Sequence, residues 1–313
     1  MKGLELSKQY YEIYGEPMLK DRFPELLDRI AVGLCGSGSE CFGFDDEVSR
    51  DHDMEPGFCI FLPGEDAVDR RTAFLLERAY SELPKEFGGL KRSLMAPAGG
   101  RRMGPVRTAD FFAARTGLDH VPGTYAEWLS IPEYALAEAV NGEVFYDGYG
   151  EFTAIRNALR SMPEDVRLKK LAGRFMMMSQ SGRYNFERCT RHRENAAAQL
   201  AVNEFVQHAL QAAFLLNKAY APFYKWVFRA LRQQPLLSEL ADPLEYLLCG
   251  INGEASFDTR MFTIEEVCAA AAGCAREQGI SLNLCDDLEK DAWSINDHID
   301  DPDLRNMSIL AAV

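Results

Sequence analysis

The chain has 313 residues, of which 47% are hydrophobic, and its 48 acidic and 34 basic side chains give a formal net charge of −14 at pH 7. This length and apolar content exclude a disordered chain and allow one large domain or two. The negative charge disfavours a nucleic-acid partner bound through its phosphates. No apolar run reaches the roughly 20 residues of a membrane span, and the N-terminal residues lack the apolar core of a signal peptide. We therefore expect a cytoplasmic protein with no membrane partner.

The first half of the chain mixes helical and strand patterns. Residues 1–30 have the spacing of apolar residues that is typical of helices. A second helix is predicted over residues 64–84, with Asp66 as N-cap and Phe74, Leu75 and Leu76 as core candidates. A basic, glycine-rich loop at 85–104 follows. The pattern then predicts a strand at 105–108, helices to 114 and over 124–139, and a strand between the turns of 141–148.

From Phe152 onwards the sequence is almost entirely helical. We therefore expect two domains, residues 1–150 and 151–313. The acidic last forty residues are interpreted as a solvated surface. The predicted helices span 151–161, 164–181, 183–218, 221–233, 238–249 and 263–279.

The eight cysteines are scattered along the chain. They form no C-x-x-C pair and no Cys/His cluster with the spacing of a zinc site. We expect reduced, mostly buried thiols.

The stretch from Val32 to Leu62 carries the clearest chemical signal. A Gly/Ser turn, residues 36–39, follows an apolar segment, and Asp51-His52-Asp53 precedes a second apolar run. In an extended segment alternate side chains share a face, so Asp51 and Asp53 would project together about 6.5 to 7 Å apart. Two such carboxylates favour a shared Mg²⁺ or Mn²⁺.

A Gly/Ser turn beside an acidic pair suits the handling of phosphates. Glycine lets the backbone approach phosphate oxygens, a serine hydroxyl donates to them, and a following helix N-terminus favours their charge. The stretch is not a P-loop, because no G-x-x-x-x-G-K-[ST] sequence occurs. It is not an EF-hand either, because Pro56 and Leu62 occupy the sixth and twelfth loop positions counted from Asp51.

Gly38-Ser39, followed after eleven residues by Asp51-His52-Asp53, resembles the signature of the DNA polymerase beta-like nucleotidyltransferase superfamily. Gly36-Ser37, with thirteen intervening residues, fits almost as well. The longer string GSGSECFGFDDEVSRDHDMEPGFCIF, together with NGEVFYD and LNKAYAPFYKW, is similar to a bacterial family of uncharacterised nucleotidyltransferase-like proteins.

The resemblance implies an α+β protein in which a small mixed-sheet domain precedes an all-helical domain that closes over the nucleotide. Gly38 and Ser39, or Ser37 in the alternative spacing, would contact the triphosphate of an NTP. Asp51 and Asp53 would hold Mg²⁺ or Mn²⁺.

The superfamily's third carboxylate, which commonly acts as general base, fits poorly. The strand at 105–108 offers Arg107 in place of an acid, and Asp110 falls just beyond it. Glu143 and Asp147 are the other candidates, with Glu143 taken as catalytic. His52 would lie on the opposite strand face from the aspartates.

The segment Asn217–Trp226 combines two lysines with three aromatic rings. Lys218 and Lys225 would neutralise phosphate charge, and Tyr220 or Tyr224 would stack on the base. A purely structural interpretation, with aromatic core residues and solvated lysines, is equally open.

The sequence thus predicts an Mg²⁺-dependent nucleotidyltransferase that moves a nucleoside monophosphate from an NTP, ATP in the first instance, to a hydroxyl or amine of a small-molecule or protein acceptor. The missing carboxylate supports an alternative, a catalytically silent nucleotide sensor or antitoxin-like partner. The oligomeric state stays open.

Overall fold

The computed structural model describes residues 1–48, 54–92, 103–250 and 256–313. Contacts between Cα atoms divide the chain into two compact units. The first, called the sheet unit, comprises Met1–Pro122 and Ala135–Ser161. The second, called the helical unit, comprises Gly123–Tyr134 and Met162–Val313. Within the described ranges no helix is long and apolar enough to cross a membrane.

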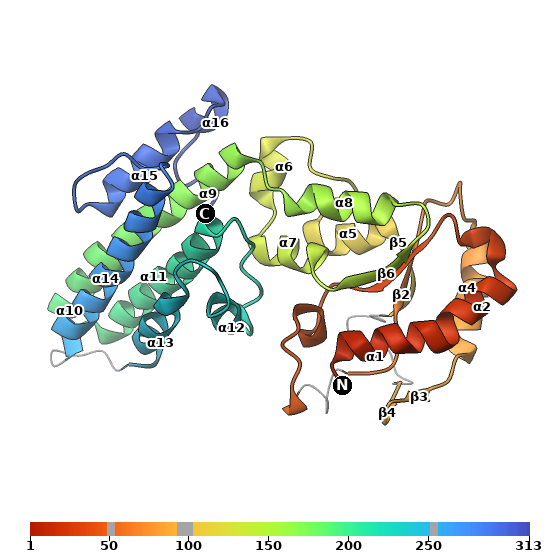
Figure 1. Cartoon of the computed structure of the whole chain (residues 1–313). Coiled ribbons are helices and arrows are strands. Elements are labelled where there is room, and N and C mark those ends of the chain that lie inside the picture. Colours follow the sequence, from red (N-terminus) through yellow and green to blue (C-terminus); the bar gives the residue numbers. More distant parts are fainter. Residues whose placement is uncertain (49–53, 93–102, 251–255) are drawn as a thin grey trace. The chain divides into compact units, whose positions relative to one another are not determined.

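A four-stranded mixed sheet forms the centre of the sheet unit, in the order β5-β2-β1-β6 (Figure 1). The strands are β1 (Ala31–Leu34), β2 (Cys59–Leu62), β5 (Gly104–Arg107) and β6 (Glu143–Asp147). β1 pairs antiparallel with both β2 and β6, whereas β5 runs parallel to β2. A separate hairpin joins β3 (Glu86–Phe87) to β4 (Leu90–Lys91). The small mixed sheet confirms the predicted α+β class.

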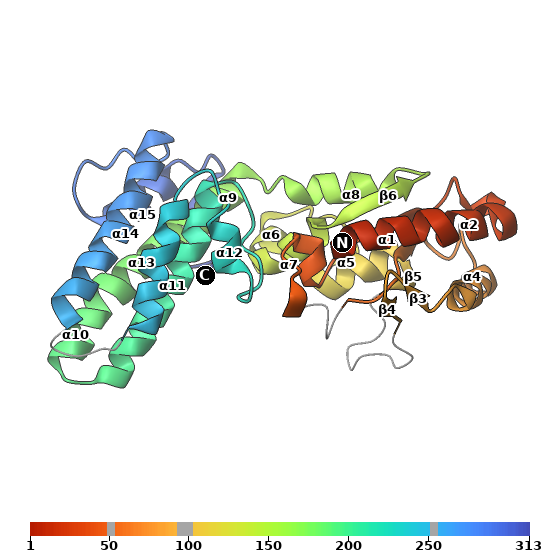
Figure 2. The same ribbon diagram turned by 60° about the horizontal axis from the view of Figure 1, so that its bottom comes forward.

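Every residue of β1 and β2 is buried, which shows that both faces of the sheet are covered. Helices provide this cover. One face packs on α1 (Gly3–Tyr10), α2 (Glu16–Arg22) and α4 (Arg70–Glu82). α1 and α2 follow each other end to end through a π-helical turn, Tyr11–Gly15 (Figure 2). The other face packs on α5 (Thr108–Thr116) and α8 (Glu151–Arg160), where Phe61 contacts Phe111 and Phe152.

The start of α4 differs from the prediction. The helix begins at Arg70, and Asp69 is the N-cap, since its Oδ1 accepts a hydrogen bond from the Thr72 N–H at 2.7 Å. The face of α4 that packs on the core carries Leu76, whereas Phe74 and Leu75 are 58% and 44% exposed. Asp66 as cap and Phe74 and Leu75 as core residues were therefore wrong predictions.

α8 belongs to the sheet unit by its contacts, although the sequence places it in the second domain. Its Phe152 ring stacks on Phe61 with centroids 3.7 Å apart. Conversely, α6 (Tyr125–Ser130) belongs to the helical unit, although the sequence places it in the first domain. The predicted helix at 124–139 is divided by Pro132 into α6 and α7 (Glu133–Val140).

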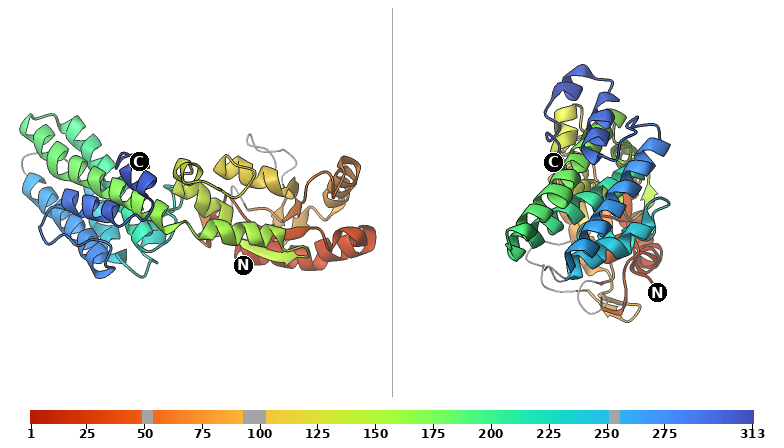
Figure 3. Two further views of the ribbon diagram at one scale, coloured as in Figure 1. Left: turned by 90° about the horizontal axis from the view of Figure 1, so that it is seen from above. Right: turned by 90° about the vertical axis from the view of Figure 1, so that its left-hand side faces the viewer.

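The helical unit is built around long helices that lie side by side (Figure 3). α11 (Asn195–Leu216) contacts both α9 (Glu164–Met178) and α14 (Phe257–Glu277). A π-helical segment, Ser179–Asn185, continues α9. The shorter elements are α10 (Phe186–Arg191), α12 (Val227–Leu231), a 3-10 helix (Ser238–Leu240), α13 (Ala241–Cys249), α15 (Leu288–Asp297) and α16 (Pro302–Asn306).

Two predictions for this unit are corrected. The single helix over 183–218 is interrupted at Arg193, whose φ of +62° ends α10 before α11 starts. The acidic end of the chain is not simply a solvated surface. Asp291 is fully buried and lies 2.9 Å from Arg276, and Asp287 and Asp301 cap α15 and α16.

Candidate functional site

The Gly/Ser turn leaves the end of β1 with a backbone that depends on glycine. Gly36 and Gly38 have φ values of +102° and +124°, which residues other than glycine rarely adopt. A one-turn 3-10 helix, Ser39–Phe42, follows. In the described part of the chain the backbone N–H groups of Ser37, Gly38 and Ser39 have no hydrogen-bond partner. Successive backbone N–H groups without a protein partner are available to bind an anion.

Asn141, which precedes β6, fixes the position of this turn. The Gly36 N–H donates to Asn141 Oδ1, and Asn141 Nδ2 donates to the Gly36 carbonyl, both at 2.8 Å. The Gly142 N–H donates to the Cys41 carbonyl at 2.9 Å. The Ser37 hydroxyl donates to Glu138 Oε2 at 3.0 Å. The turn is thus held by residues of the segment that leads into β6 and by Glu138.

An arginine lies directly against the turn. A Cβ on Gly36 would come within 2.1 Å of Arg115 Nη2, so only glycine leaves room for this guanidinium. The group lies 3.7 Å from the centroid of the Phe111 ring, and its Nη1 donates to the Phe111 carbonyl at 2.7 Å. Its Nε is buried and has no hydrogen-bond partner among the described residues, and burial lowers the pKa of Arg115. A bound anion would compensate this charge.

A second arginine supports the other side of the turn. The Nη2 of Arg156 donates to the carbonyls of Val140, Asn141 and Gly142, and the side chain is almost fully buried. Sequence analysis missed both arginines because they reach the turn from α5 and α8, without any local motif. The only signal was the pattern of aromatic residues that buries these two helices against the sheet.

The predicted metal ligands Asp51 and Asp53, with His52 between them, lie outside the described residues. β2 begins at Cys59, and residues 54–58 before it are not part of a strand. Within the described ranges no group of three His, Cys, Asp or Glu side chains is placed to hold a metal ion. The metal pair therefore stays a prediction.

The three candidates for the third carboxylate have different surroundings. Glu143 pairs with Leu34, at the end of β1 from which the turn leaves, and its side chain forms an exposed ion pair with Lys8 at 2.7 Å. Asp147 caps α8 by accepting the N–H groups of Gly150 and Thr153. Asp110 is exposed on α5. Glu143 is thus the candidate whose backbone lies beside the turn.

The predicted lysine and tyrosine ligands lie in the helical unit, so their convergence with the Gly/Ser turn stays a prediction. Lys218 and Lys225 are exposed, and Lys218 Nζ lies 3.9 Å from Glu164. Tyr224 is 70% exposed and free to stack on a ring. Burial raises the pKa of Tyr220, whose hydroxyl is hydrogen-bonded to the Met162 backbone. Tyr220 is therefore less suited to stacking than Tyr224.

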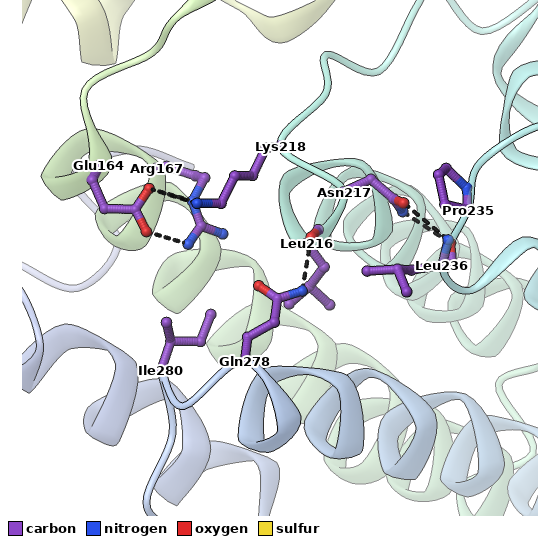
Figure 4. Close-up of a pocket in the computed structure, with 9 residues that line it drawn as sticks. All are labelled: Glu164, Arg167, Leu216, Asn217, Lys218, Pro235, Leu236, Gln278 and Ile280. Atoms are coloured by element: carbon purple, nitrogen blue, oxygen red, sulfur yellow. Dashed lines mark hydrogen bonds and ion pairs between the residues drawn. The ribbon is translucent and has the colours of Figure 1, made fainter.

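A pocket of about 400 Å³ surrounds Lys218 at the C-terminal end of α11 (Figure 4). Its polar side chains serve the last carbonyls of that helix. Arg167 Nη1 donates to the Leu215 carbonyl at 3.0 Å, Gln278 Nε2 to the Leu216 carbonyl at 2.9 Å, and Asn217 Nδ2 to the Ala213 carbonyl at 2.8 Å. These groups end the helix, which explains the pocket lining without a ligand.

The cysteines near the turn do not supply a nucleophile. Cys35 and Cys59 are buried, and burial raises the pKa of their thiols to about 11 and about 12. Both thiols are therefore protonated at neutral pH. All eight cysteines are free in the structure, and five of them are buried, in line with the prediction of mostly buried thiols.

Comparison with known proteins gives two findings. Residues 128–227 match the family described as Domain of unknown function (DUF4037). The crystal structure of a nucleotidyltransferase-like protein from Exiguobacterium sibiricum is similar over 87% of this chain and 78% of its own, with 12% sequence identity and a TM-score of 0.38. The comparison with curated proteins gave no match. About a third of the chain is therefore similar to a family whose function is not described.

Proposed function

We propose that the protein is a nucleotidyltransferase that transfers a nucleoside monophosphate from an NTP, ATP in the first instance, to a hydroxyl or amine of an acceptor. One observation carries the proposal. Three free backbone N–H groups, Ser37 to Ser39, lie in a glycine-dependent turn against the partly unpaired guanidinium of Arg115. This arrangement suits the β- and γ-phosphates of a nucleotide.

The roles of the residues follow from this placement. The N–H groups and the Ser39 hydroxyl would bind phosphate oxygens, and Arg115 would offset the charge that develops on pyrophosphate as it leaves. Asp51 and Asp53 suit Mg²⁺ or Mn²⁺, since both are carboxylates two residues apart and neighbouring this turn in sequence. A metal bound there would bridge and polarise the phosphates. Glu143 is the base candidate for the acceptor's proton.

Labelled nucleotides test the proposal. The protein is incubated with α-labelled NTPs, Mg²⁺ and a panel of hydroxyl and amine acceptors, and products are separated from free nucleotide. We expect transfer that is lost in Asp51→Asn/Asp53→Asn, and nucleotide binding that weakens about tenfold in Arg115→Met, a loss of about 1.4 kcal/mol. Absence of labelled product, combined with unchanged nucleotide binding in both variants, would refute it.

A silent nucleotide sensor is the second candidate, and one observation favours it. β5 runs parallel to β2, where the resemblance expects the third acid, yet it carries Arg107, whose Nη1 donates to the Pro63 carbonyl at 2.6 Å. A sensor would bind NTP through the same turn without forming product. A structure with nucleotide in which Glu143 stays paired with Lys8 and away from the α-phosphate would support the sensor over the enzyme.

A further inference from the structure

The helical unit encloses a cluster of four titratable side chains. Glu133 begins α7, Lys170 and Arg174 lie one turn apart on one face of α9, and His208 comes from α11. Their exposed fractions are 3%, 1%, 7% and 8% in that order. Charged side chains are seldom so buried unless they are paired. The question is therefore whether the charges within this cluster are balanced.

The charges of the cluster do not balance. Two cations, Lys170 and Arg174, face one carboxylate, Glu133. Burial and the neighbouring Arg174 lower the pKa of His208 to about 4, so its imidazole is neutral at pH 7. When both cations are charged, one buried positive charge is left without a counter-charge, which is unfavourable. Burial accordingly lowers the pKa of Lys170, whose Nζ also donates to the Ile131 carbonyl at 3.0 Å. One additional anion would neutralise the net positive charge of the cluster.

The contacts within the cluster are also loose. One oxygen, Glu133 Oε1, lies 3.7 Å from Lys170 Nζ and 3.4 Å from Arg174 Nη2, and Arg174 Nη1 lies 3.4 Å from His208 Nδ1. Within the part of the chain that the structure describes, Arg174 Nε has no hydrogen-bond partner. On the same helix, Arg167 binds both oxygens of Glu164 at 2.6 and 2.9 Å. Arg174 thus lacks the two-oxygen partner that its planar fork is suited to bind.

We propose that this cluster is an anion site that takes the phosphoryl group of a phosphorylated ligand, and that Glu133 is an internal counter-ion which the ligand displaces. A phosphate presents several oxygens at once, which would fill the Arg174 fork and reach Lys170 Nζ and a His208 ring N–H. The proposal goes beyond nucleotidyl transfer and does not depend on it, since all four residues belong to the helical unit.

Exposed aromatic rings that begin at the residue after Glu133 offer a surface for the rest of the ligand. Tyr134 follows Glu133 directly and is 46% exposed. Its ring lies 5.8 Å from Phe223, which lies 4.5 Å from Tyr224. Exposed rings of this kind stack on planar groups. AMP should therefore bind more tightly than ribose 5-phosphate, and Phe223→Leu should remove that difference. Equal affinities would restrict the site to the phosphoryl group alone and overturn the aromatic part of the inference.

Thermal unfolding of the whole chain tests the phosphate site with a matched pair of variants. Glu133→Gln removes the internal counter-ion, so we expect a lower Tm in chloride buffer, a saturable rise on adding inorganic phosphate, and phosphate affinity about tenfold above wild type. Glu164→Gln removes a carboxylate from the same helix whose Arg167 partner also bonds Leu215. It should show no phosphate-specific rise at equal ionic strength. The same phosphate response in both variants would overturn the proposal.

Imidazole NMR of the wild-type protein gives a second readout, which reports on phosphate binding directly. The chain has five histidines, so loss of one resonance in His208→Gln assigns His208. Inorganic phosphate should shift that resonance saturably, while chloride at the same ionic strength should not, and Arg174→Met should weaken the effect at least about tenfold. A His208 resonance that phosphate leaves unchanged would refute the site.

Discussion

Replacing Asn141 by alanine tests how the Gly/Ser turn is held. The two 2.8 Å hydrogen bonds between this amide and the Gly36 backbone are lost together. A typical hydrogen bond contributes about 1 kcal/mol net, and a buried group left unsatisfied costs about 1 to 3 kcal/mol. Gly36 is buried. We therefore expect Asn141→Ala to lower the free energy of unfolding of the sheet unit by about 2 to 4 kcal/mol.

The assay has to follow the sheet unit itself. All three tryptophans, Trp128, Trp226 and Trp293, lie in the helical unit, so their fluorescence does not monitor the turn. Hydrogen exchange of the β1 and β6 amides does. If the proposed function holds, the affinity for a non-hydrolysable ATP analogue should also fall about tenfold, because the free N–H groups lose their fixed arrangement.

Tyr146→Phe is the matched control in the same strand. It removes one hydrogen bond, from the Tyr146 hydroxyl to the Leu27 carbonyl at 2.7 Å, at the opposite end of β6. It should cost about 1 kcal/mol of stability and leave nucleotide affinity unchanged. The reasoning fails if Asn141→Ala changes stability by less than about 0.5 kcal/mol, or if the control weakens nucleotide binding equally.

Three further predictions concern packing and pH. Gly142→Ala should destabilise the sheet unit by more than about 2 kcal/mol, because its Cβ would lie 2.0 Å from the Leu34 carbonyl at a φ of +69°; protected β1 amides in the variant would contradict this. Phe152→Ala should cost about 3 to 5 kcal/mol, measured by urea denaturation, since the ring is buried against Phe61. The pKa of His208 is lowered from 6.5 to about 4, so the unfolded chain binds the proton more readily. The stability from the neutral imidazole is complete above about pH 6.5 and falls by up to about 3 kcal/mol towards pH 4. His208→Gln should flatten that part of the profile, and identical profiles would exclude the effect.

The sequence predicted the elements whose signals are local. The Gly36 and Gly38 turn, the strand after it and the Asn-Gly turn before β6 all depend on residues that favour one backbone conformation, and each is present. The α+β class followed from the resemblance and is confirmed. The start of α4 was misplaced because Asp66 and Asp69 are both acceptable caps, and the choice between them depends on which face of the helix meets the sheet.

The site residues that sequence analysis missed share a different cause. Arg115 and Arg156 act on the turn through backbone carbonyls, stacking and proximity, all of which arise only after α5 and α8 have packed on Phe61 and its neighbours. Arg193 shows the same limit, since apolar residues recur at helical spacing on both sides of the break. Nothing in the local pattern distinguishes a residue at φ +62° from its helical neighbours.

The sheet unit is discontinuous in sequence, and this bears on how the chain is made. β6, an edge strand of the sheet, and α8, which covers the Phe61 face, both come after the excursion of Gly123–Tyr134 into the other unit. During synthesis the sheet unit therefore lacks its last strand and one covering helix until residue 161 has emerged. Until residue 147 has emerged, β1 has an unpaired edge, and before residue 141 Gly36 has no Asn141 to hold it. A fragment ending at residue 122 would carry the Gly/Ser turn without the structure that shapes it.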